Sequence, residues 1–249
     1  MIKNILKKIL PPHYIEILKK FRNKFPIIAQ RQNKFSKIYS FIHKYTLTKY
    51  KINKFYNRNI RNLEIGPGDY RLNNFLTINI VKNRVTDCVV DINKRLPFKD
   101  NTFHTIYASH IVEHIFWYKL DKLFSELYRV TAPSGCVEIW VPDGLKIAKA
   151  FVDAELKKNT NWLQDGWFRF NDARDCCTWF NGRIFSYGDG FGDRYHYNIH
   201  LSCFSERYLK KLFLDAGFSK VERMSHQECR GYDHGWINLG IRGKNSNRG

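Results

Sequence analysis

The sequence lacks several features that would place it in a familiar class. No apolar run approaches the ~20 residues of a membrane-spanning helix. Lys7 and Lys8 interrupt the N-terminal apolar stretch, which is therefore not built like a signal peptide. The six cysteines form no C-x-x-C pair, so neither a zinc site nor a disulfide scaffold is predicted. We expect a cytoplasmic protein with reduced thiols.

Acidic residues are nearly absent from the start of the chain. The formal net charge is +19, and the first 60 residues hold 15 Lys and Arg against a single acid, Glu16. Residues 1–25 place apolar and basic side chains at helical spacing on either side of Pro11-Pro12, which predicts two short basic amphipathic helices. We interpret residues 1–58 as a basic helical extension with an anionic partner.

The partner of this extension stays open between several alternatives. The helices can lie on an anionic membrane surface, peripheral at the inner membrane face. They can instead pack on the rest of the protein or on a second subunit of a homo-oligomer. Nucleic acid and a polyanionic glycan are further anionic partners. A composition rich in Lys, Asn and Ile, as expected from an AT-rich genome, explains the charge without any partner.

An alternation of strands and crossover connections begins near residue 59. The predicted strands cover residues 61–66, 75–80, 88–92, 102–110, 136–142, 220–225 and 236–242. Helical patterns cover residues 111–130 and 205–216. The connection between the first two strands is too short for more than a vestigial helix. Because strands joined by crossovers form parallel sheets, we predict one α/β domain over residues 59–249.

Residues 151–200 interrupt this pattern with a segment that is too aromatic for a solvated linker. Its aromatic side chains include Trp162, Trp167, Phe168, Phe170, Trp179, Phe180, Phe185, Tyr187, Phe191, Tyr195 and Tyr197. We predict an inserted lid or subdomain. Its rings either shape an acceptor pocket by stacking on a sugar or planar group, or they build a second small core or an oligomer interface.

A glycine-rich turn follows the first predicted strand. In the segment LEIGPGD, residues 63–69, Gly66 and Gly68 let a ligand approach the backbone closely. Arg71 stands where the dinucleotide fingerprint would have its third glycine, which argues against a nicotinamide cofactor. A nucleoside ligand without phosphates does not need the third glycine, because it has no pyrophosphate to place against the turn.

The order of the motifs that follow is more specific than the turn alone. Asp91 ends the third strand, Leu96-Pro97-Phe98 precedes the fourth, and Ser109-His110 and Glu113-His114 come after it. Over residues 59–143 this order resembles the class I S-adenosylmethionine-dependent methyltransferases. It looks closest to a branch found among glycan and small-molecule biosynthesis enzymes. The resemblance returns at residues 200–217 and in the last two strands.

The resemblance implies a Rossmann-like fold: a seven-stranded, mostly parallel sheet with one antiparallel strand and helices on both faces. It also implies S-adenosyl-L-methionine as the cofactor. The residues that it places at the cofactor are Glu64, Ile65, Gly66, Pro67, Gly68, Asn79, Asp91, Ile92, Ser109 and His110. The first five would line the methionine portion, and Asp91 with Ile92 would meet the adenine. Asn79 stands where the family usually has an acid that bonds the ribose hydroxyls, so this contact lacks charge assistance.

Histidines supply most of the candidate catalytic groups. His110, His114 or His200 can act as the general base of an O-methylation, because imidazole titrates near neutral pH. Asp143, just past the fifth strand, is a further candidate. His110 and His114, with Glu113 between them, resemble part of a metal site. No further ligand stands at a known spacing from them, so no metal is predicted. Methyl transfer can also rely on positioning alone.

The sequence thus predicts a methyltransferase that acts on an oxygen of a sugar, glycan or related cell-envelope metabolite. One alternative is a nucleic-acid methyltransferase, which the basic extension favours. Against it, residues 107–110 read YASH and not the Asn/Asp-Pro-Pro-aromatic turn of enzymes that methylate exocyclic amines. The other alternative is a non-catalytic binding or scaffold protein that keeps the methyltransferase fold, with Asn79 as its mark.

Overall fold

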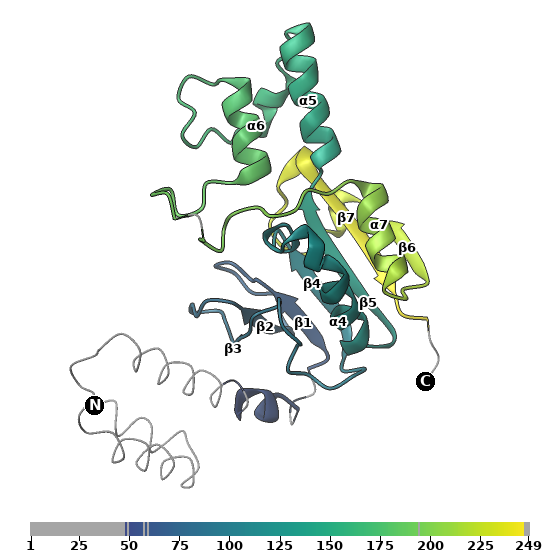
Figure 1. Ribbon diagram of the computed structural model, residues 1–249. Helices are drawn as coiled ribbons and strands as arrows, with labels where there is room; N and C mark the ends of the chain where they lie inside the picture. Colours follow the sequence, from purple (N-terminus) through teal and green to yellow (C-terminus); the bar gives the residue numbers. More distant parts are fainter. Residues whose placement is uncertain (1–47, 49, 57, 59, 194, 247–249) are drawn as a thin grey trace, which may run out of the picture. The chain divides into compact units, whose positions relative to one another are not determined.

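The computed structural model describes residues 48, 50–56, 58, 60–193 and 195–246 (Figure 1). Residues 48–249 form one compact unit. The predicted amphipathic helices of residues 1–25 lie outside the described residues. Part of the predicted extension belongs to the compact unit, since residues 50–56 are helical and bury Ile52 and Phe55 in its main core.

A seven-stranded sheet organises this unit. Its strands are β1 (Asn62–Ile65), β2 (Leu76–Asn79), β3 (Cys88–Val89), β4 (Phe103–Ser109), β5 (Thr131–Pro142), β6 (Lys220–Arg223) and β7 (Asn238–Lys244). They lie in the order β3-β2-β1-β4-β5-β7-β6. Only β7 runs antiparallel to its neighbours. The predicted fold class is confirmed, and the strand order reverses direction between β1 and β4, where ligands bind in open α/β sheets.

Two α-helices and residues 50–56 cover one face of the sheet. α4 (Leu120–Val130) buries a stripe at helical spacing that includes Leu123, Phe124 and Leu127. α7 (Glu206–Asp215) adds Leu209, Leu212 and Phe213. These side chains meet Leu63, Ile106 and Ile139 of the central strands, and together they form the main core.

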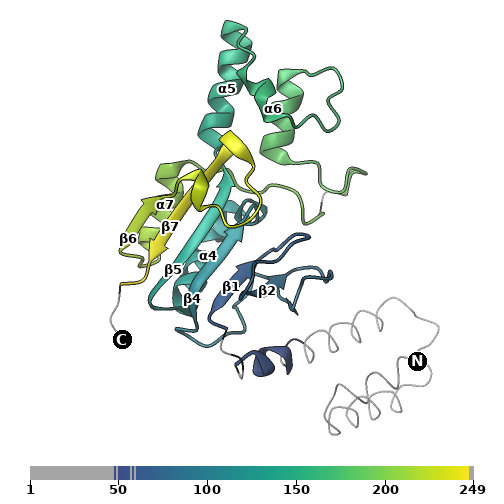
Figure 2. The ribbon, with the colours of Figure 1, turned by 180° about the vertical axis from the view of Figure 1, so that it is seen from behind.

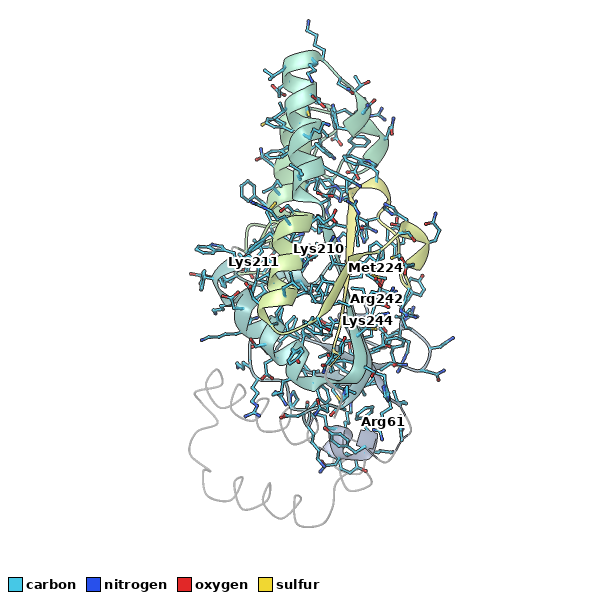
Figure 3. All side chains as sticks on the ribbon, turned by 90° about the vertical axis from the view of Figure 1, so that its right-hand side faces the viewer. Arg61, Lys210, Lys211, Met224, Arg242 and Lys244 are labelled. Carbon is cyan, nitrogen blue, oxygen red and sulfur yellow. The ribbon has the colours of Figure 1, made fainter. Side chains whose placement is uncertain are left out.

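The opposite face is covered by connections (Figure 2). Phe75, Tyr107, Trp140 and Met224 form a second, smaller core there, beneath a segment that contains the 3-10 helices η5 (His226–Glu228) and η6 (Gly235–Ile237). The edge-on view of Figure 3 shows α7 with Lys210 and Lys211 on one side and Met224 with Arg242 on the other. Residues 66–75 contain turns and no helix, as the short first connection predicts, and residues 80–87 also contain turns and no helix.

The aromatic insertion forms a separate helical layer beyond the carboxyl ends of the strands (Figure 1). It comprises α5 (Gly144–Lys157), η4 (Asn161–Asp165) and α6 (Cys176–Phe185). Ile147, Trp162, Trp179 and Ile237 form its buried centre. Trp162, Trp167, Phe168, Trp179 and Phe180 therefore build a small core, whereas Tyr195 and Tyr197 line the main pocket. Within the described residues, no helix combines the length and apolar character needed to cross a membrane.

The predicted helix over residues 111–130 begins later than its apolar pattern suggests. Residues 112–114 and 117–119 form the 3-10 helices η2 (Val112–His114) and η3 (Trp117–Lys119), and α4 starts only at Leu120. The reason is tertiary: the Glu113 carbonyl accepts hydrogen bonds from the backbone N–H groups of Leu201 and Ser202, at 2.7 and 3.0 Å. An acceptor committed to a distant segment is not available to continue a helix.

Candidate active site

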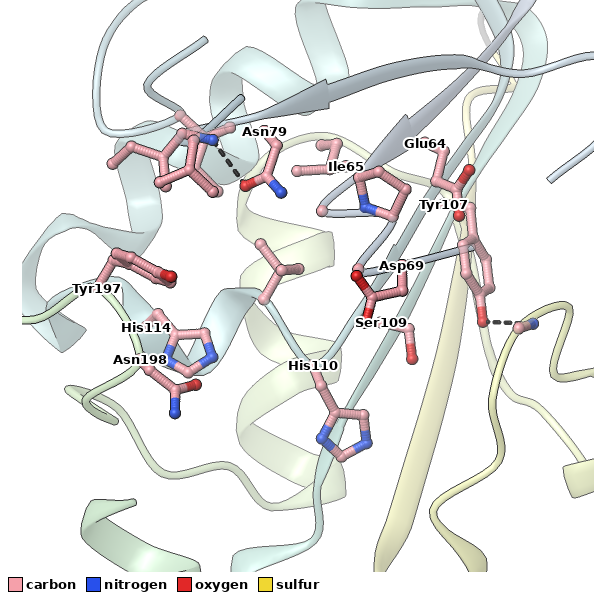
Figure 4. A pocket seen from close by; sticks show the side chains of 18 of the residues that line it. Glu64, Ile65, Asp69, Asn79, Tyr107, Ser109, His110, His114, Tyr197 and Asn198 are labelled. Atoms are coloured by element: carbon pink, nitrogen blue, oxygen red, sulfur yellow. Dashed lines mark hydrogen bonds between the residues drawn. The ribbon is translucent and has the colours of Figure 1, made fainter. Parts of the chain in front are cut away.

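A pocket of about 900 Å³ opens at the carboxyl ends of β1, β2 and β4 (Figure 4). Of the predicted cofactor residues, nine line it: Glu64, Ile65, Gly66, Pro67, Gly68, Asn79, Ile92, Ser109 and His110. The candidate catalytic residue His114 lines it too. Asp91, Asp143 and His200 do not. The sheet brings these side chains together because parallel strands present their carboxyl ends at one edge.

The glycine turn brings the backbone to the pocket wall. Gly66 and Gly68 have φ values of +69° and +60°, which glycine adopts without strain. A Cβ added at Gly66 would lie 2.0 Å from Ile111 Cδ1, so no side chain fits there. At Gly68 an added Cβ meets nothing within 4 Å, because the position faces open space. A ligand can therefore contact the main chain of the turn directly.

Glu64 holds the connection that leaves this turn. Its side chain is buried, and its Oε2 accepts a hydrogen bond of 2.8 Å from the Leu72 backbone N–H. Burial raises the pKa of Glu64, although the Leu72 bond and the charge of Arg71 act in the opposite direction. Glu64 thus fixes the floor of the pocket as well as lining it.

Asn79 presents a donor to the pocket. Its Oδ1 accepts a 2.8 Å hydrogen bond from the Ile80 N–H, which Figure 4 shows as a dashed line. One lone pair of the oxygen is thus used, and the amide NH₂ offers a donor to a ligand. A ribose hydroxyl can accept from this amide, whereas the acid usual at this position would accept from the hydroxyl.

Asp91 lies beside the pocket wall, which at this point is formed by Val90, Ile92 and Asn93. Asp91 Oδ1 accepts from the backbone N and the Nδ2 of Asn93, at 3.0 and 3.1 Å. Lys94 Nζ lies 3.6 Å from its Oδ2. The carboxylate thus closes a local turn, and its contact with adenine stays a prediction.

His110 is held on both sides of its ring. It follows β4 with φ +53°, and its Nε2 lies 2.7 Å from Asn238 Oδ1. Its Nδ1 lies 3.3 Å from Glu113 Oε1, and its ring stacks on His234 with 3.7 Å between centroids. Because an amide oxygen can only accept, Nε2 carries the proton. His110 is therefore fixed by the fold, with its Nδ1 turned toward Glu113.

A second pocket of about 450 Å³ adjoins the first and shares His110, His114, Asn198, Tyr232 and His234 with it. Its remaining wall includes Trp167, Tyr187 and Arg183 from the insertion, together with Glu113 and His200. The lining thus includes both aromatic side chains and hydrogen-bonding groups. His200 thus belongs to the second pocket, and His114 stands between the two.

Several titratable side chains in this region are buried, and burial affects their pKa values. Burial opposes ionisation of Glu113, but the neighbouring imidazoles of His110, His114 and His200 outweigh it and lower its pKa. Burial also lowers the pKa of His200, and burial with the charges of His110 and Arg183 lowers that of His234 to about 4. The surroundings of this wall thus favour the ionised form of Glu113, and burial opposes positive charge on His200 and His234.

Asp143 has a structural position. It is buried, and its side chain accepts a 3.1 Å hydrogen bond from the Lys146 N–H at the start of α5. It lines neither pocket. An N-cap role accounts for an aspartate at this position, immediately before a helix.

The sequence did not point to the wall formed by Arg230, Gly231, Tyr232 and His234, in the connection between β6 and β7. Glu138 holds this connection, because Arg230 Nε and Nη2 donate to its carboxylate at 2.6 and 3.0 Å. Residues so far apart in the chain carry no spacing signal. The high density of histidines was the only hint.

The part of the chain that forms this site matches a known family. Residues 65–139, from the end of β1 into β5, match the family described as a methyltransferase domain. The cofactor that this match indicates is S-adenosyl-L-methionine, in agreement with the sequence prediction. No curated protein matches the chain.

Solved structures that are similar to the chain include three methyltransferases. One is the CurJ carbon methyltransferase, with 15% identity and a TM-score of 0.44. The match covers 81% of this chain and 54% of the CurJ chain, so this chain spans about half the length of the CurJ chain. Another is a SAM-dependent methyltransferase from Thermotoga maritima, titled a possible histamine N-methyltransferase (16%, TM-score 0.40, 88% and 98% covered). The third is a SAM-dependent methyltransferase from Archaeoglobus fulgidus (16%, TM-score 0.40, 83% and 99% covered). Similarity this weak carries no argument about function.

Proposed function

We propose that this protein transfers a methyl group from S-adenosylmethionine to a hydroxyl of a sugar, glycan or related cell-envelope metabolite. The observation that carries the proposal is the Gly66–Gly68 turn opening into a large pocket that continues into a second, polar and aromatic one. The first space suits a nucleoside cofactor, and the second suits a polyhydroxylated acceptor.

In the first pocket, the chain's own groups would bind and orient the cofactor. The backbone of residues 66–68 would follow the methionine portion, and the Asn79 NH₂ would donate to a ribose hydroxyl. Ile92 and Asn93 would flank the adenine. When bound, S-adenosylmethionine supplies a methyl group on an electrophilic sulfonium, so the protein has mainly to position it and exclude water.

The second pocket has the features of a sugar site. Trp167 and Tyr187 line this space, and the Arg183 guanidinium lies 4.7 Å from the centroid of the Trp167 ring. Nε2 of His114 and of His200 can accept hydrogen bonds from acceptor hydroxyls, because the Nδ1 of each ring faces a backbone carbonyl. Flat apolar faces with directional acceptors between them favour a sugar ring over a purely apolar acceptor.

A direct test incubates the full chain with S-adenosylmethionine and separate panels of nucleotide sugars, glycans and RNA, and measures release of S-adenosylhomocysteine. We expect release with a sugar-containing acceptor. As a control, Gly68→Val, whose side chain would project into open pocket space, should abolish it. Salt-sensitive methylation of RNA alone would support the nucleic-acid alternative. Cofactor binding without turnover on any acceptor would support the scaffold alternative.

We also propose that the basic residues 1–25 hold the enzyme at an anionic membrane surface, where lipid-linked glycans would be within reach. The support is the sequence alone: lysines interleaved with apolar positions at helical spacing. Sedimentation with anionic vesicles at low salt, lost at high salt and with neutral vesicles, is the expected result. Equal sedimentation by a variant with these lysines changed to glutamine would refute it.

A further inference from the structure

Three potential metal ligands meet on the wall between the two pockets. Glu113 and His114 lie on η2, and His200 lies in the segment that follows α6. One ligand atom from each of them lies within 4.8 Å of the others. The chain is held together here by backbone hydrogen bonds from Leu201 and Ser202 to the Glu113 carbonyl, at 2.7 and 3.0 Å.

The two imidazoles are oriented as metal-ligating histidines commonly are. His114 Nδ1 lies 3.1 Å from the carbonyl oxygen of Ile199, and His200 Nδ1 lies 3.1 Å from that of Arg183. A carbonyl can only accept, so each Nδ1 carries the proton and each Nε2 keeps its lone pair. Such second partners fix the tautomer and raise the basicity of the ligating nitrogen.

The buried carboxylate of Glu113 indicates that a ligand binds here. Its side chain is 2% exposed, and neither carboxylate oxygen accepts a hydrogen bond from any residue that the structure describes. His110 Nδ1 approaches Oε1 to 3.3 Å but without hydrogen-bond geometry. A buried carboxylate without hydrogen bonds is costly, so such groups are paired or bind metals.

We propose that Glu113, His114 and His200 form a binding site for a divalent transition-metal ion of the zinc class. Two imidazole nitrogens and a carboxylate oxygen are the ligand set of open zinc sites, in which the fourth position faces a substrate. Ligand atoms around tetrahedral zinc lie ~3.3 Å apart, so separations of up to 4.8 Å would have to shorten when the ion binds. Sequence reasoning predicted no metal because His200, the missing third ligand, lies far along the chain.

The fourth position would face the second pocket, which Glu113, His114 and His200 all line. If the proposed function holds, the ion would take the place of direct hydrogen bonds from the acceptor to the two Nε2 atoms. An acceptor hydroxyl would then occupy the fourth position, where the ion would orient it and favour loss of its proton to water. This role rests on the proposed function. The metal site itself does not, because its ligands are defined without reference to any methyl donor.

The test titrates metal-free full-length protein with Co²⁺, followed by visible absorption, and with Zn²⁺ in competition. We expect one equivalent of Co²⁺ with absorption bands of four- or five-fold coordination, displaced by Zn²⁺. His200→Ala, His114→Ala and Glu113→Gln should each weaken binding at least tenfold, whereas the exposed His104→Ala should leave it unchanged. Circular dichroism of each metal-free variant shows whether it is folded, and three independent variants keep the test open if one is not.

Two results would overturn the proposal: wild-type protein that takes up no stoichiometric Co²⁺ or Zn²⁺, or folded ligand variants that bind as tightly as the wild type. Calorimetry with S-adenosylmethionine on the metal-free protein separates this outcome from failure of the proposed function. Metal binding that depends on His200 in a protein that does not bind the methyl donor would support the metal site while refuting the enzyme.

Discussion

Replacing Glu138 with glutamine removes the charge that joins β5, β7 and the pocket wall. The Glu138 side chain is 1% exposed, and its two oxygens accept four hydrogen bonds of 2.6–3.1 Å from Arg230 and Arg242. Glutamine keeps the shape but offers one acceptor oxygen to two guanidinium groups. Its NH₂ would then face their N–H donors.

The expected cost follows from the exposure of the partners. Removing one member of a fully buried ion pair costs about 3–5 kcal/mol. Arg230 is 42% exposed and Arg242 19%, so water can solvate part of the charge left behind. We therefore expect Glu138→Gln to lower the free energy of unfolding by about 2–3 kcal/mol, and Tm by roughly 5–10 °C.

Urea denaturation followed by circular dichroism measures this change. Asp215→Asn, which removes an exposed ion pair with Lys211, serves as the control and should leave stability unchanged. Because Arg230 lines the main pocket, Glu138→Gln should also weaken binding of S-adenosylmethionine. A folded variant within about 0.5 kcal/mol of wild type would show that this network does not hold the wall.

Three further predictions concern the pocket. Asn79→Ala should weaken S-adenosylmethionine about fivefold in calorimetry, the worth of one neutral hydrogen bond of about 1 kcal/mol; unchanged affinity would remove Asn79 from the ribose site. Asp91→Ala should weaken it roughly tenfold if the carboxylate turns to the adenine, and hardly at all if it stays on Asn93 as the structure has it. His234 has its pKa lowered to about 4 by burial and by the charges of His110 and Arg183. Its contribution to stability is therefore complete above pH 6.5 and lost as the pH falls toward 4. The free energy of unfolding of the wild type should thus fall more steeply across this range than that of His234→Gln. Parallel curves of unfolding free energy against pH would contradict this.

Local patterns were sufficient to predict the sheet. The starts of β1, β2, β3 and β4 fall within one residue of the sequence prediction, because each strand is a short apolar run that follows turn residues. The Gly66–Gly68 turn was also predictable, since glycine adopts its positive φ values without strain. The close approach of Ile111 to Gly66 was not predictable. β5 begins earlier than its apolar run, at Thr131, where its register with β4 shifts between Phe103 and Thr105.

Contacts between distant segments were not predictable in the same way. The commitment of the Glu113 carbonyl to residues 201 and 202 shortens the predicted helix, and nothing within residues 111–119 signals it. The same contact brings His200 to His114 and Glu113. The connection that carries Arg230 and His234 to the pocket is held by Glu138, which accepts from Arg230, and by Asn238, which donates to Asp233. Each of these depends on pairs that a single sequence does not mark.

Isothermal titration calorimetry with S-adenosylmethionine tests the central claim most directly. We predict one binding site per chain for the wild type, and none for folded Gly68→Val, whose side chain would occupy the space that now lies open beside the turn. Unchanged binding by Gly68→Val would place the cofactor elsewhere. No binding by folded wild-type protein would contradict the account and leave the fold as a scaffold with another purpose.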